Sequence, residues 1–178
     1  IRSTQQSWTD SLGNEFAGLN IPVHRGKAVM VSPTEVEVRS PKDDSVIETL
    51  TSRFILVATG SEPTFPAGVK PDGERIIAPR HTQTLNTVPE HIVFIGDGVT
   101  ATEYASAFSR LGSKVEIFAF FDTLLPAGEP AAARFITRHL EENLGITIHR
   151  KEMVVETSRN GTGVRTRSKS GRIVESDF

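Results

Sequence analysis

The stretch that decides the fold is His91-Ile-Val-Phe-Ile-Gly-Asp-Gly-Val-Thr-Ala101, a strand-length apolar run that leads directly into a glycine-rich turn. Its second half, from Gly96 to Ala101, fits the pattern G-x-G-x-x-(G/A), which opens the helix of a dinucleotide-binding βαβ unit. In that pattern Gly96 permits the tight turn, Gly98 lets a pyrophosphate approach the backbone, and Ala101 keeps the helix close to the sheet. The phosphates are then expected on free N–H groups at the positive end of the helix dipole.

The residues on both sides of this turn supply the context that the motif requires. We predict a helix over Val99–Leu111 and a second strand over Lys114–Phe118, which complete one βαβ unit with the first strand. Small and apolar side chains recur along one face of this helix, as packing on a sheet requires. They are Ala101, Tyr104, Ala105, Phe108, Leu111 and Gly112. The alternative, an ordinary strand-to-helix turn with incidental glycines, does not account for this context.

The sequence leaves the choice between NAD and NADP open. An NAD site usually places an acid at the end of the second strand, roughly 20 residues after the first glycine, to hold the ribose hydroxyls. Here that position is Ala119, followed by Phe120 and Phe121, while Glu116 lies within the strand and Asp122 comes late. No Lys or Arg directly follows the strand to accept a 2′-phosphate. We therefore expect weak discrimination between the two cofactors.

The segments before the motif predict a helix, a β-meander and a linker. Trp8, Leu12, Phe16 and Leu19 share one face of a helix that ends at Asn20 and Pro22. Trp8 and Phe16 are most simply core contacts, with a surface for a missing partner as the alternative. Strands are predicted over Lys27–Val31, Glu35–Arg39, Val46–Thr51 and Arg53–Ala58, the last apolar enough to be covered on both faces. The proline- and glycine-rich segment Ser61–Gly73 is predicted to be a linker with a domain boundary near it.

The segments after the βαβ unit predict a second helix, a strand and another meander. Pro130 suits the first turn of a helix that runs to about Asn143 and stops at Gly145. Its inner face is marked by Ile136, Leu140 and Leu144. A strand over Ile146–His149 follows, and Met153–Ser176 is predicted to form a meander with turns at Asn160-Gly161 and Ser170-Gly171.

Composition excludes several classes of function. A formal charge of −2 removes the electrostatic argument for a nucleic-acid or anionic-membrane partner, and no apolar run is long enough to span a bilayer. Without cysteine there is no disulfide framework or thiolate metal site, and with no signal peptide at the N-terminus this favours a cytoplasmic location. The five histidines show no metal-ligand spacing, and no Ser-His-Asp arrangement is evident. We therefore expect no metal and no catalytic residue in these positions.

Three stretches together resemble the pyridine nucleotide–disulfide oxidoreductase family. They are Phe54-Ile-Leu-Val-Ala-Thr-Gly-Ser61, Ile92-Val-Phe-Ile-Gly-Asp-Gly-Val-Thr-Ala-Thr-Glu-Tyr-Ala-Ser106 and Leu111-Gly-Ser-Lys-Val115. The resemblance implies an α/β fold in which residues 1–61 are the end of the first segment of an FAD-binding domain. Residues 62–178 would be a Rossmann-type NAD(P)-binding domain with a β-meander crossover, lacking its last strand. The family also has a C-terminal domain through which it forms homodimers.

The resemblance assigns cofactor contacts to particular residues. Ala28 is expected beside the FAD adenine, and Thr59, Gly60 and Ser61 near the flavin nucleotide. The nicotinamide nucleotide is expected on Gly96, Asp97, Gly98, Val99, Thr100, Ala101, Thr102 and Glu103, with Glu103 reaching toward the nicotinamide end and Val154 touching the adenine. The plainer alternatives are a strand exit at Thr59-Gly60 and, for Glu103, a solvated acid at the favourable end of the helix dipole.

The family's first FAD fingerprint and its redox cysteine pair are absent from these residues. The chain is therefore expected to be part of an FAD-dependent NAD(P)H oxidoreductase and to be inactive alone. Glu103-Tyr-Ala-Ser106 and the acid-free strand end most resemble the soluble transhydrogenase branch, in which hydride passes from NAD(P)H to FAD to NAD(P)+. A dihydrolipoamide dehydrogenase-type disulfide reductase is one alternative, and a non-catalytic dinucleotide-sensing module is another.

Overall fold

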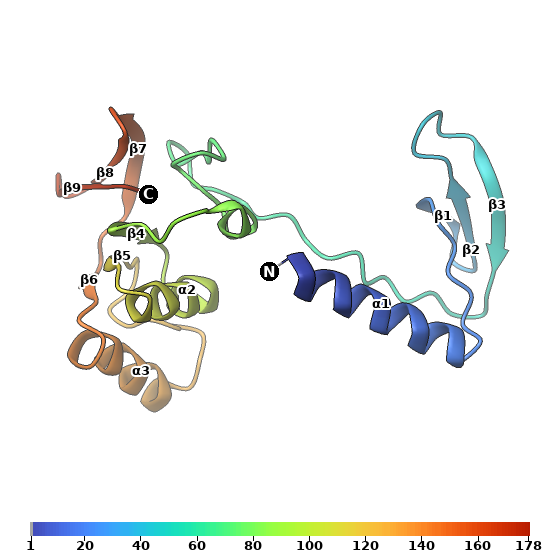
Figure 1. The fold of residues 1–178 in the computed structure, drawn as a ribbon, viewed down its shortest axis with the longest axis horizontal. Helices are drawn as coiled ribbons and strands as arrows, with labels where there is room; N and C mark the ends of the chain where they lie inside the picture. The colour runs from blue at the N-terminus through green and yellow to red at the C-terminus, as the bar shows by residue number, and fades with distance from the viewer. Residues whose placement is uncertain (1) are drawn as a thin grey trace. The chain divides into compact units, whose positions relative to one another are not determined.

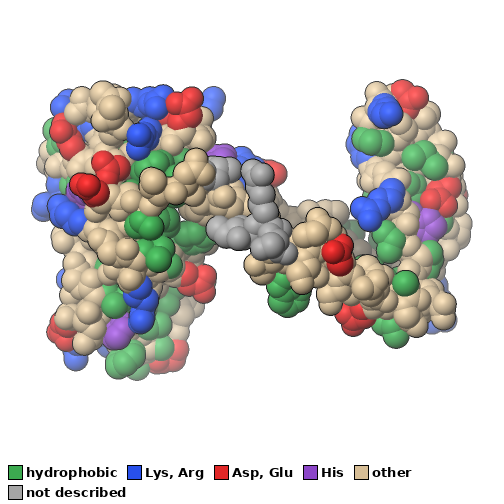
Figure 2. Space-filling model, in the orientation of Figure 1, with side chains coloured by type: hydrophobic (Ala, Val, Ile, Leu, Met, Phe, Trp, Pro, Cys, Tyr) green, Lys and Arg blue, Asp and Glu red, His purple; other side chains and the backbone are tan. Residues whose placement is uncertain are grey.

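The computed structural model describes residues 2–178, apart from the side chains of residues 2, 3 and 84. It divides the chain into two compact units, Ile1–Glu62 and Pro63–Phe178, and the elements of each can be followed in Figure 1. On the face shown in Figure 2, basic and acidic side chains are interspersed. Among the described residues, no helix combines the length and the apolar character needed to cross a bilayer.

Unit Ile1–Glu62 contains one helix and a three-stranded meander, as predicted. Helix α1 spans Arg2–Gly18, and Asn20 follows it with a φ of 55°, the left-handed conformation in which helices commonly end. The antiparallel strands are β1 (Lys27–Ser32), β2 (Glu35–Arg39) and β3 (Val46–Thr51), paired in that order. The alternating apolar residues of β2 place Val38 in the buried part of this small sheet.

Two predictions for this unit are wrong. The apolar run Arg53–Ala58 forms no strand, and Leu56 is 91% exposed. A strand needs a neighbour to pair with, and β3 pairs only with β2 in the described sheet. Trp8 and Phe16 are not core contacts of this unit either, since their exposed fractions are 67% and 38%. A missing partner on this face of α1 stays a prediction.

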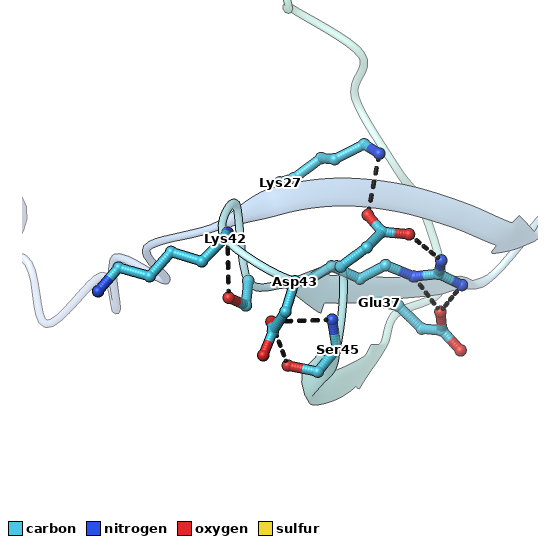
Figure 3. A network of polar contacts seen from close by, with 8 residues as sticks. Lys27, Glu37, Lys42, Asp43 and Ser45 are labelled. Carbon is cyan, nitrogen blue, oxygen red and sulfur yellow. Dashed lines mark hydrogen bonds and ion pairs between the residues drawn. The ribbon is translucent and has the colours of Figure 1, made fainter.

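A network of exposed charges surrounds the turn between β2 and β3 (Figure 3). The Asp44 carboxylate accepts hydrogen bonds from Lys27 Nζ at 3.0 Å and from Arg39 Nη1 at 2.9 Å, while Asp43 accepts from the side chain of Ser45 at 2.8 Å. Lys27 first and Arg39 second lower the pKa of Asp44. Exposed pairs of this kind contribute little to stability, so the network chiefly fixes the conformation of the turn.

Unit Pro63–Phe178 is built on a parallel three-stranded sheet in the order β4-β5-β6. Its strands are β4 (His91–Ile95), β5 (Lys114–Phe118) and β6 (Thr147–His149), and its helices are α2 (Val99–Arg110) and α3 (Pro130–Glu142). The predicted βαβ unit, the second helix and the third strand are all confirmed, with ends that differ by one residue. A short 3-10 helix, Pro79–Thr84, was not predicted.

One face of the sheet packs against α2 and α3. The buried core on this side includes Ala105 and Phe108 of α2, Ile117 of β5 and Leu140 of α3, which confirms the predicted inner faces. Leu111, at 62% exposure, and Gly112 are exceptions: both are exposed and follow the last residue of α2, Arg110. Thr102 is buried instead, and its Oγ1 donates to the carbonyl oxygen of Gly98 at 2.9 Å.

The opposite face of the sheet is covered by an antiparallel meander. Its strands are β7 (Val154–Asn160), β8 (Gly163–Ser168) and β9 (Ile173–Ser176). Val154 packs with Phe118 of β5 and with Val69, which belongs to the irregular segment predicted as a linker. The first turn is Gly161-Thr162 rather than Asn160-Gly161, since Asn160 pairs with Gly163.

The outer edge of β4 is met by the last two residues of the chain. Asp177 N donates to the carbonyl oxygen of His91 at 3.0 Å, and Val93 N donates to the carbonyl oxygen of Phe178 at 2.9 Å. The Asp177 carboxylate also accepts a hydrogen bond from the backbone N–H of His91 at 2.9 Å. These bonds satisfy part of an edge that the three-stranded sheet itself leaves open.

Candidate dinucleotide-binding site

The turn between β4 and α2 has the conformation that its glycines allow. Gly96 has a φ of 124°, which other residues rarely adopt, and its N–H donates to the carbonyl oxygen of Phe118 at 2.9 Å. Gly98 forms the N-cap of α2 in an extended conformation that any residue can adopt. The two glycines therefore have different reasons to be there: backbone conformation requires Gly96, whereas nothing in the conformation requires Gly98.

The space in front of both glycines is empty of protein atoms. A Cβ added at Gly96 or Gly98 would meet nothing within 4 Å. Beyond Gly98, the first N–H groups of α2 have no partner within the helix because a helix leaves its opening donors unpaired. Open space over unpaired donors at the positive end of a helix is what the pyrophosphate of a dinucleotide requires, so the site fits that group.

Asp97 connects this turn to the loop that follows β5. Its Oδ2 accepts a hydrogen bond from the backbone N–H of Phe121 at 2.9 Å, and its carbonyl oxygen accepts one from Leu125 N at 2.6 Å. The sequence motif places no requirement on this middle position, so the bracing role was not predicted. The turn and the loop therefore have backbone positions that depend on each other.

The other residues of the fingerprint divide into exposed and buried positions on α2. Val99, Thr100 and Glu103 are exposed, whereas Ala101 is half-buried and Thr102 is buried. The predicted reach of Glu103 toward the nicotinamide end stays a prediction. The Thr102 hydroxyl donates to the carbonyl oxygen of the N-cap residue Gly98, and a contact of Thr102 with the nucleotide stays a prediction.

Ala119 lies where the acid of an NAD site was sought, and it is completely buried. It packs in the core beneath α2 and α3, its N–H donates to the carbonyl oxygen of His149, and its own carbonyl oxygen accepts from Glu152 N. The next two residues are the exposed ones, with Phe120 at 56% and Phe121 at 49%. The side chain that this strand end presents outward is therefore an aromatic ring.

A cavity of about 480 Å³ adjoins the fingerprint turn. At the turn it is lined by Gly96, Thr100, Ala101, Phe120, Met153 and Val154. From there it extends along β4 toward Phe65, Arg75 and Phe178. Its volume lies in the range of small-molecule sites, and its lining is mostly apolar. Val154, predicted to touch an adenine, is therefore on the wall of a cavity that also contains the glycine turn.

Two cations approach the loop after β5 from a distant part of the chain. Lys151 Nζ lies 2.8 Å from Asp122 Oδ2, and Arg150 Nε donates to the carbonyl oxygen of Asp122 at 2.9 Å. The Lys151 ammonium lowers the pKa of Asp122. Arg150 also pairs with Glu141 at 2.6 Å. Sequence reasoning looked for a cation directly after β5 and missed these, because they follow β6.

Glu116 forms a buried ionic cluster at the centre of the sheet. Its carboxylate lies 2.6 Å from His149 Nε2, 2.8 Å from Lys114 Nζ and 3.0 Å from His91 Nε2. Burial by itself raises the pKa of Glu116, but hydrogen bonds from Lys114 and His149 outweigh it and lower the pKa to about 2. No three His, Cys, Asp or Glu side chains among the described residues are arranged to hold a metal ion.

The residues expected beside FAD all lie in unit Ile1–Glu62 and are all exposed. Ala28 is on β1, where it pairs with Val38 of β2. Thr59, Gly60 and Ser61 lie in the irregular segment after β3, and Gly60 has a φ of 75°. Within this unit they do not enclose a ligand, so their assignment to FAD stays a prediction.

Three relatives have names that indicate nicotinamide nucleotide chemistry. An NAD(P)H dehydrogenase (quinone) of Mycobacterium tuberculosis is 29% identical over 89% of this chain and 32% of its own length. A dihydrolipoyl dehydrogenase of Chlorobaculum tepidum is 35% identical over 72% of this chain and 27% of its own. A soluble pyridine nucleotide transhydrogenase of Mycobacterium bovis is 32% identical over the same shares, 72% and 27%. The chain thus spans about a third, or less, of the length of these relatives.

The fold has a close match among solved structures. The crystal structure of LpdA from Mycobacterium tuberculosis superposes with a TM-score of 0.80 at 25% identity, over 99% of this chain and 40% of that one. The predicted α/β fold class is thereby confirmed. The family model for pyridine nucleotide-disulphide oxidoreductases matches residues 13–178, and the chain therefore belongs to the pyridine nucleotide-disulphide oxidoreductase family.

Proposed function

We propose that unit Pro63–Phe178 is the NAD(P)-binding part of an FAD-dependent oxidoreductase. The observation that carries this proposal is the empty space at Gly96 and Gly98, which lies directly before the unpaired N–H groups of α2. The pyrophosphate would bind there, and the adjoining cavity of about 480 Å³ offers room for more of the dinucleotide. Family membership supports the same assignment.

The hydride chemistry would be supplied by the nicotinamide and flavin cofactors, while this chain's residues bind and orient the nucleotide. Gly96 and Gly98 give the phosphates access to the backbone, and Asp97 fixes the loop on which the adenosine half would rest. We assign residues 1–61 to part of an FAD-binding domain, with Ala28 and Thr59–Ser61 as its cofactor contacts. The resemblance around Thr59-Gly-Ser61 and the family match support this assignment.

For the whole protein we propose hydride transfer from NAD(P)H to FAD and then to NAD(P)+. A nucleotide transhydrogenase must accept both NAD and NADP, and the end of β5 offers no carboxylate to repel a 2′-phosphate, since Ala119 and Phe120 stand there. The similarity to the Mycobacterium bovis transhydrogenase supports this choice. By the same resemblance, we place the whole protein in a homodimer.

A dihydrolipoyl dehydrogenase-type reductase is the second candidate, favoured by the 35% identity to the Chlorobaculum tepidum enzyme. The two candidates differ in whether the whole protein carries a redox-active cysteine pair. The 178 residues contain no cysteine, so such a pair would have to lie outside them. Reading the gene on both sides of this region separates them. Assaying the whole protein for NADH-dependent reduction of an NADP+ analogue, with lipoamide as the competing acceptor, tests the choice directly.

The nucleotide site itself is tested by mapping amide NMR shifts while NAD+ is added to the 178-residue chain. We expect the largest shifts at Gly96, Gly98 and the first turn of α2, and none along α1. Shifts confined to another region of unit Pro63–Phe178, or no shifts at millimolar NAD+, would contradict the proposal.

A further inference from the structure

Phe120 and Phe121 form an exposed aromatic pair directly after β5. Their ring centroids are 5.0 Å apart with an interplanar angle of 80°, an edge-to-face arrangement. Both are about half exposed, although Phe118 and Ala119 immediately before them are buried. The chain therefore places two large apolar side chains in solvent just where the parallel strands end, which is the edge at which sheets of this kind bind ligands.

The backbone beneath these rings is held at several points. Phe121 N donates to Asp97 Oδ2 at 2.9 Å, and the carbonyl oxygen of Phe121 accepts from Lys151 N at 3.3 Å. Leu125 N donates to the carbonyl oxygen of Asp97 at 2.6 Å. The Phe120 ring is thus presented from a fixed position, so a ligand that contacts it does not first have to order the loop.

Phe120 differs from Phe121 in what it faces. Phe120 lines the cavity of about 480 Å³ together with Gly96, Met153 and Val154, whereas Phe121 is not part of its wall. Gly96 marks the phosphate end of that space, and Met153 and Val154 supply further apolar surface. A flat ring beside apolar side chains, close to a phosphate-binding turn, suits a planar heterocycle joined to a phosphate through a ribose.

We propose that Phe120 is the stacking platform for the adenine ring of the nicotinamide dinucleotide. The inference rests on the proposed function, because the pyrophosphate at Gly96 and Gly98 brings the adenosine half to this loop. Stacking on an aromatic ring needs no polar partner, which agrees with the lack of an acid at Ala119 and Phe120. The adenine ring is common to NAD and NADP, so stacking on Phe120 contributes affinity without distinguishing the two cofactors.

The test is a set of calorimetric titrations of NAD+, NADP+ and ADP-ribose into the 178-residue chain and its Phe120→Ala and Phe120→Trp variants. We expect Phe120→Ala to weaken all three ligands by the same factor, roughly tenfold or more, as loss of one base stack does. Phe120→Trp keeps a ring and is expected to retain affinity. Phe135→Ala removes a ring that is 71% exposed on α3 and outside the cavity, and it serves as the matched control.

A second readout reports the contact itself. When the protein's aromatic protons are saturated in a ligand-observed NMR experiment, we expect transfer chiefly to the adenine protons of NAD+, and much less of it in Phe120→Ala. Equal affinity of wild type and Phe120→Ala would overturn the inference and leave the proposed function standing. A loss of affinity for NADP+ alone would also overturn it, since the Phe120 ring would then act on the 2′-phosphate and not on the adenine. Failure of the wild-type chain to bind any of the three ligands would overturn the proposed function instead.

Discussion

Asp97 and Phe121 lie 24 positions apart in the chain and are joined by a 2.9 Å hydrogen bond from the Phe121 backbone N–H to the Asp97 carboxylate. The bond connects the fingerprint turn after β4 to the loop after β5, so these two parts of the candidate site are held together. Because the bond connects Asp97 to the loop that carries the exposed ring of Phe120, we expect its loss to weaken nucleotide binding.

Replacing Asp97 tests that coupling. Asp97→Ala removes the acceptor and is expected to cost about 1–3 kcal/mol of stability, as loss of a hydrogen bond to a charged group does. It should also weaken NAD+ binding several-fold, because the loop is no longer held. Asp97→Asn keeps an acceptor oxygen and should retain much of the stability and of the NAD+ affinity. Denaturant unfolding and calorimetry measure the two effects, and an Asp97→Ala variant with wild-type affinity would show that the loop does not depend on this bond.

The Glu116 cluster predicts a pH dependence of stability. Its pKa is lowered from 4.5 to about 2 in the folded chain, so its contribution is fully present above pH 4.5 and is lost as the pH falls from about 4.5 toward 2. A shift of that size corresponds to roughly 3 kcal/mol. In Glu116→Gln the free energy of unfolding should be lower at neutral pH and should change much less across this interval.

Glu175→Gln is the control for that measurement, since Glu175 pairs with Arg165 at the surface and both side chains are about half exposed. We expect Glu175→Gln to change the free energy of unfolding by no more than about 0.5 kcal/mol. If the Glu116 variant retained the full wild-type pH dependence, the cluster would not be the source of acid sensitivity.

Cofactor preference is predicted to be weak. The described strand end has neither a carboxylate that repels a 2′-phosphate nor an unpaired cation, as Lys151 and Arg150 are paired with Asp122 and Glu141. We expect the dissociation constants of NAD+ and NADP+ to differ by no more than about tenfold, or ~1.4 kcal/mol. A hundredfold preference for NADP+ that disappears in Lys151→Ala would contradict this expectation. It would show that the Lys151 ammonium leaves Asp122 to bind the 2′-phosphate of NADP+.

Introducing an acid at position 119 is informative for a structural reason. Ala119 is fully buried, so Ala119→Glu must either bury a carboxylate or open the loop after β5. We expect a lower free energy of unfolding, and a shift of preference toward NAD+ only to the extent that the loop opens. A variant as stable as the wild type, with an unchanged ratio of affinities, would show that the new carboxylate reaches solvent away from the ribose.

The 178-residue chain is predicted to have no oxidoreductase turnover, since it lacks the flavin fingerprint and any candidate electron relay of its own. Purified chain should show no flavin absorbance and no NADH-dependent dye reduction. A yellow protein with dye-reducing activity would contradict this expectation.

The parts of the fold that were predictable from sequence are those set by neighbouring residues. The turn at Gly96, the strand before it and the helix after it are specified by local conformation and periodicity, and the structure has all three. The Glu116 cluster was not predictable, because it depends on the parallel register that sets His91 and His149 beside the same face of β5. The apolar run Arg53–Ala58 misled for a similar reason, since a strand depends on a partner that sequence alone does not name.

The central claim, that the dinucleotide lies on the backbone at Gly98, is tested most directly by calorimetric titration of NAD+ into wild type and Gly98→Val. Apart from Gly98 and its chain neighbours, no protein atom lies within 4 Å of a Cβ added at this position, and the backbone is extended. The variant should therefore fold normally while its side chain occupies the pyrophosphate space. We predict loss of measurable binding with an unchanged far-UV circular dichroism spectrum. Gly18→Val, at an equally open position outside unit Pro63–Phe178, should bind NAD+ like the wild type. Wild-type affinity in Gly98→Val would contradict the account.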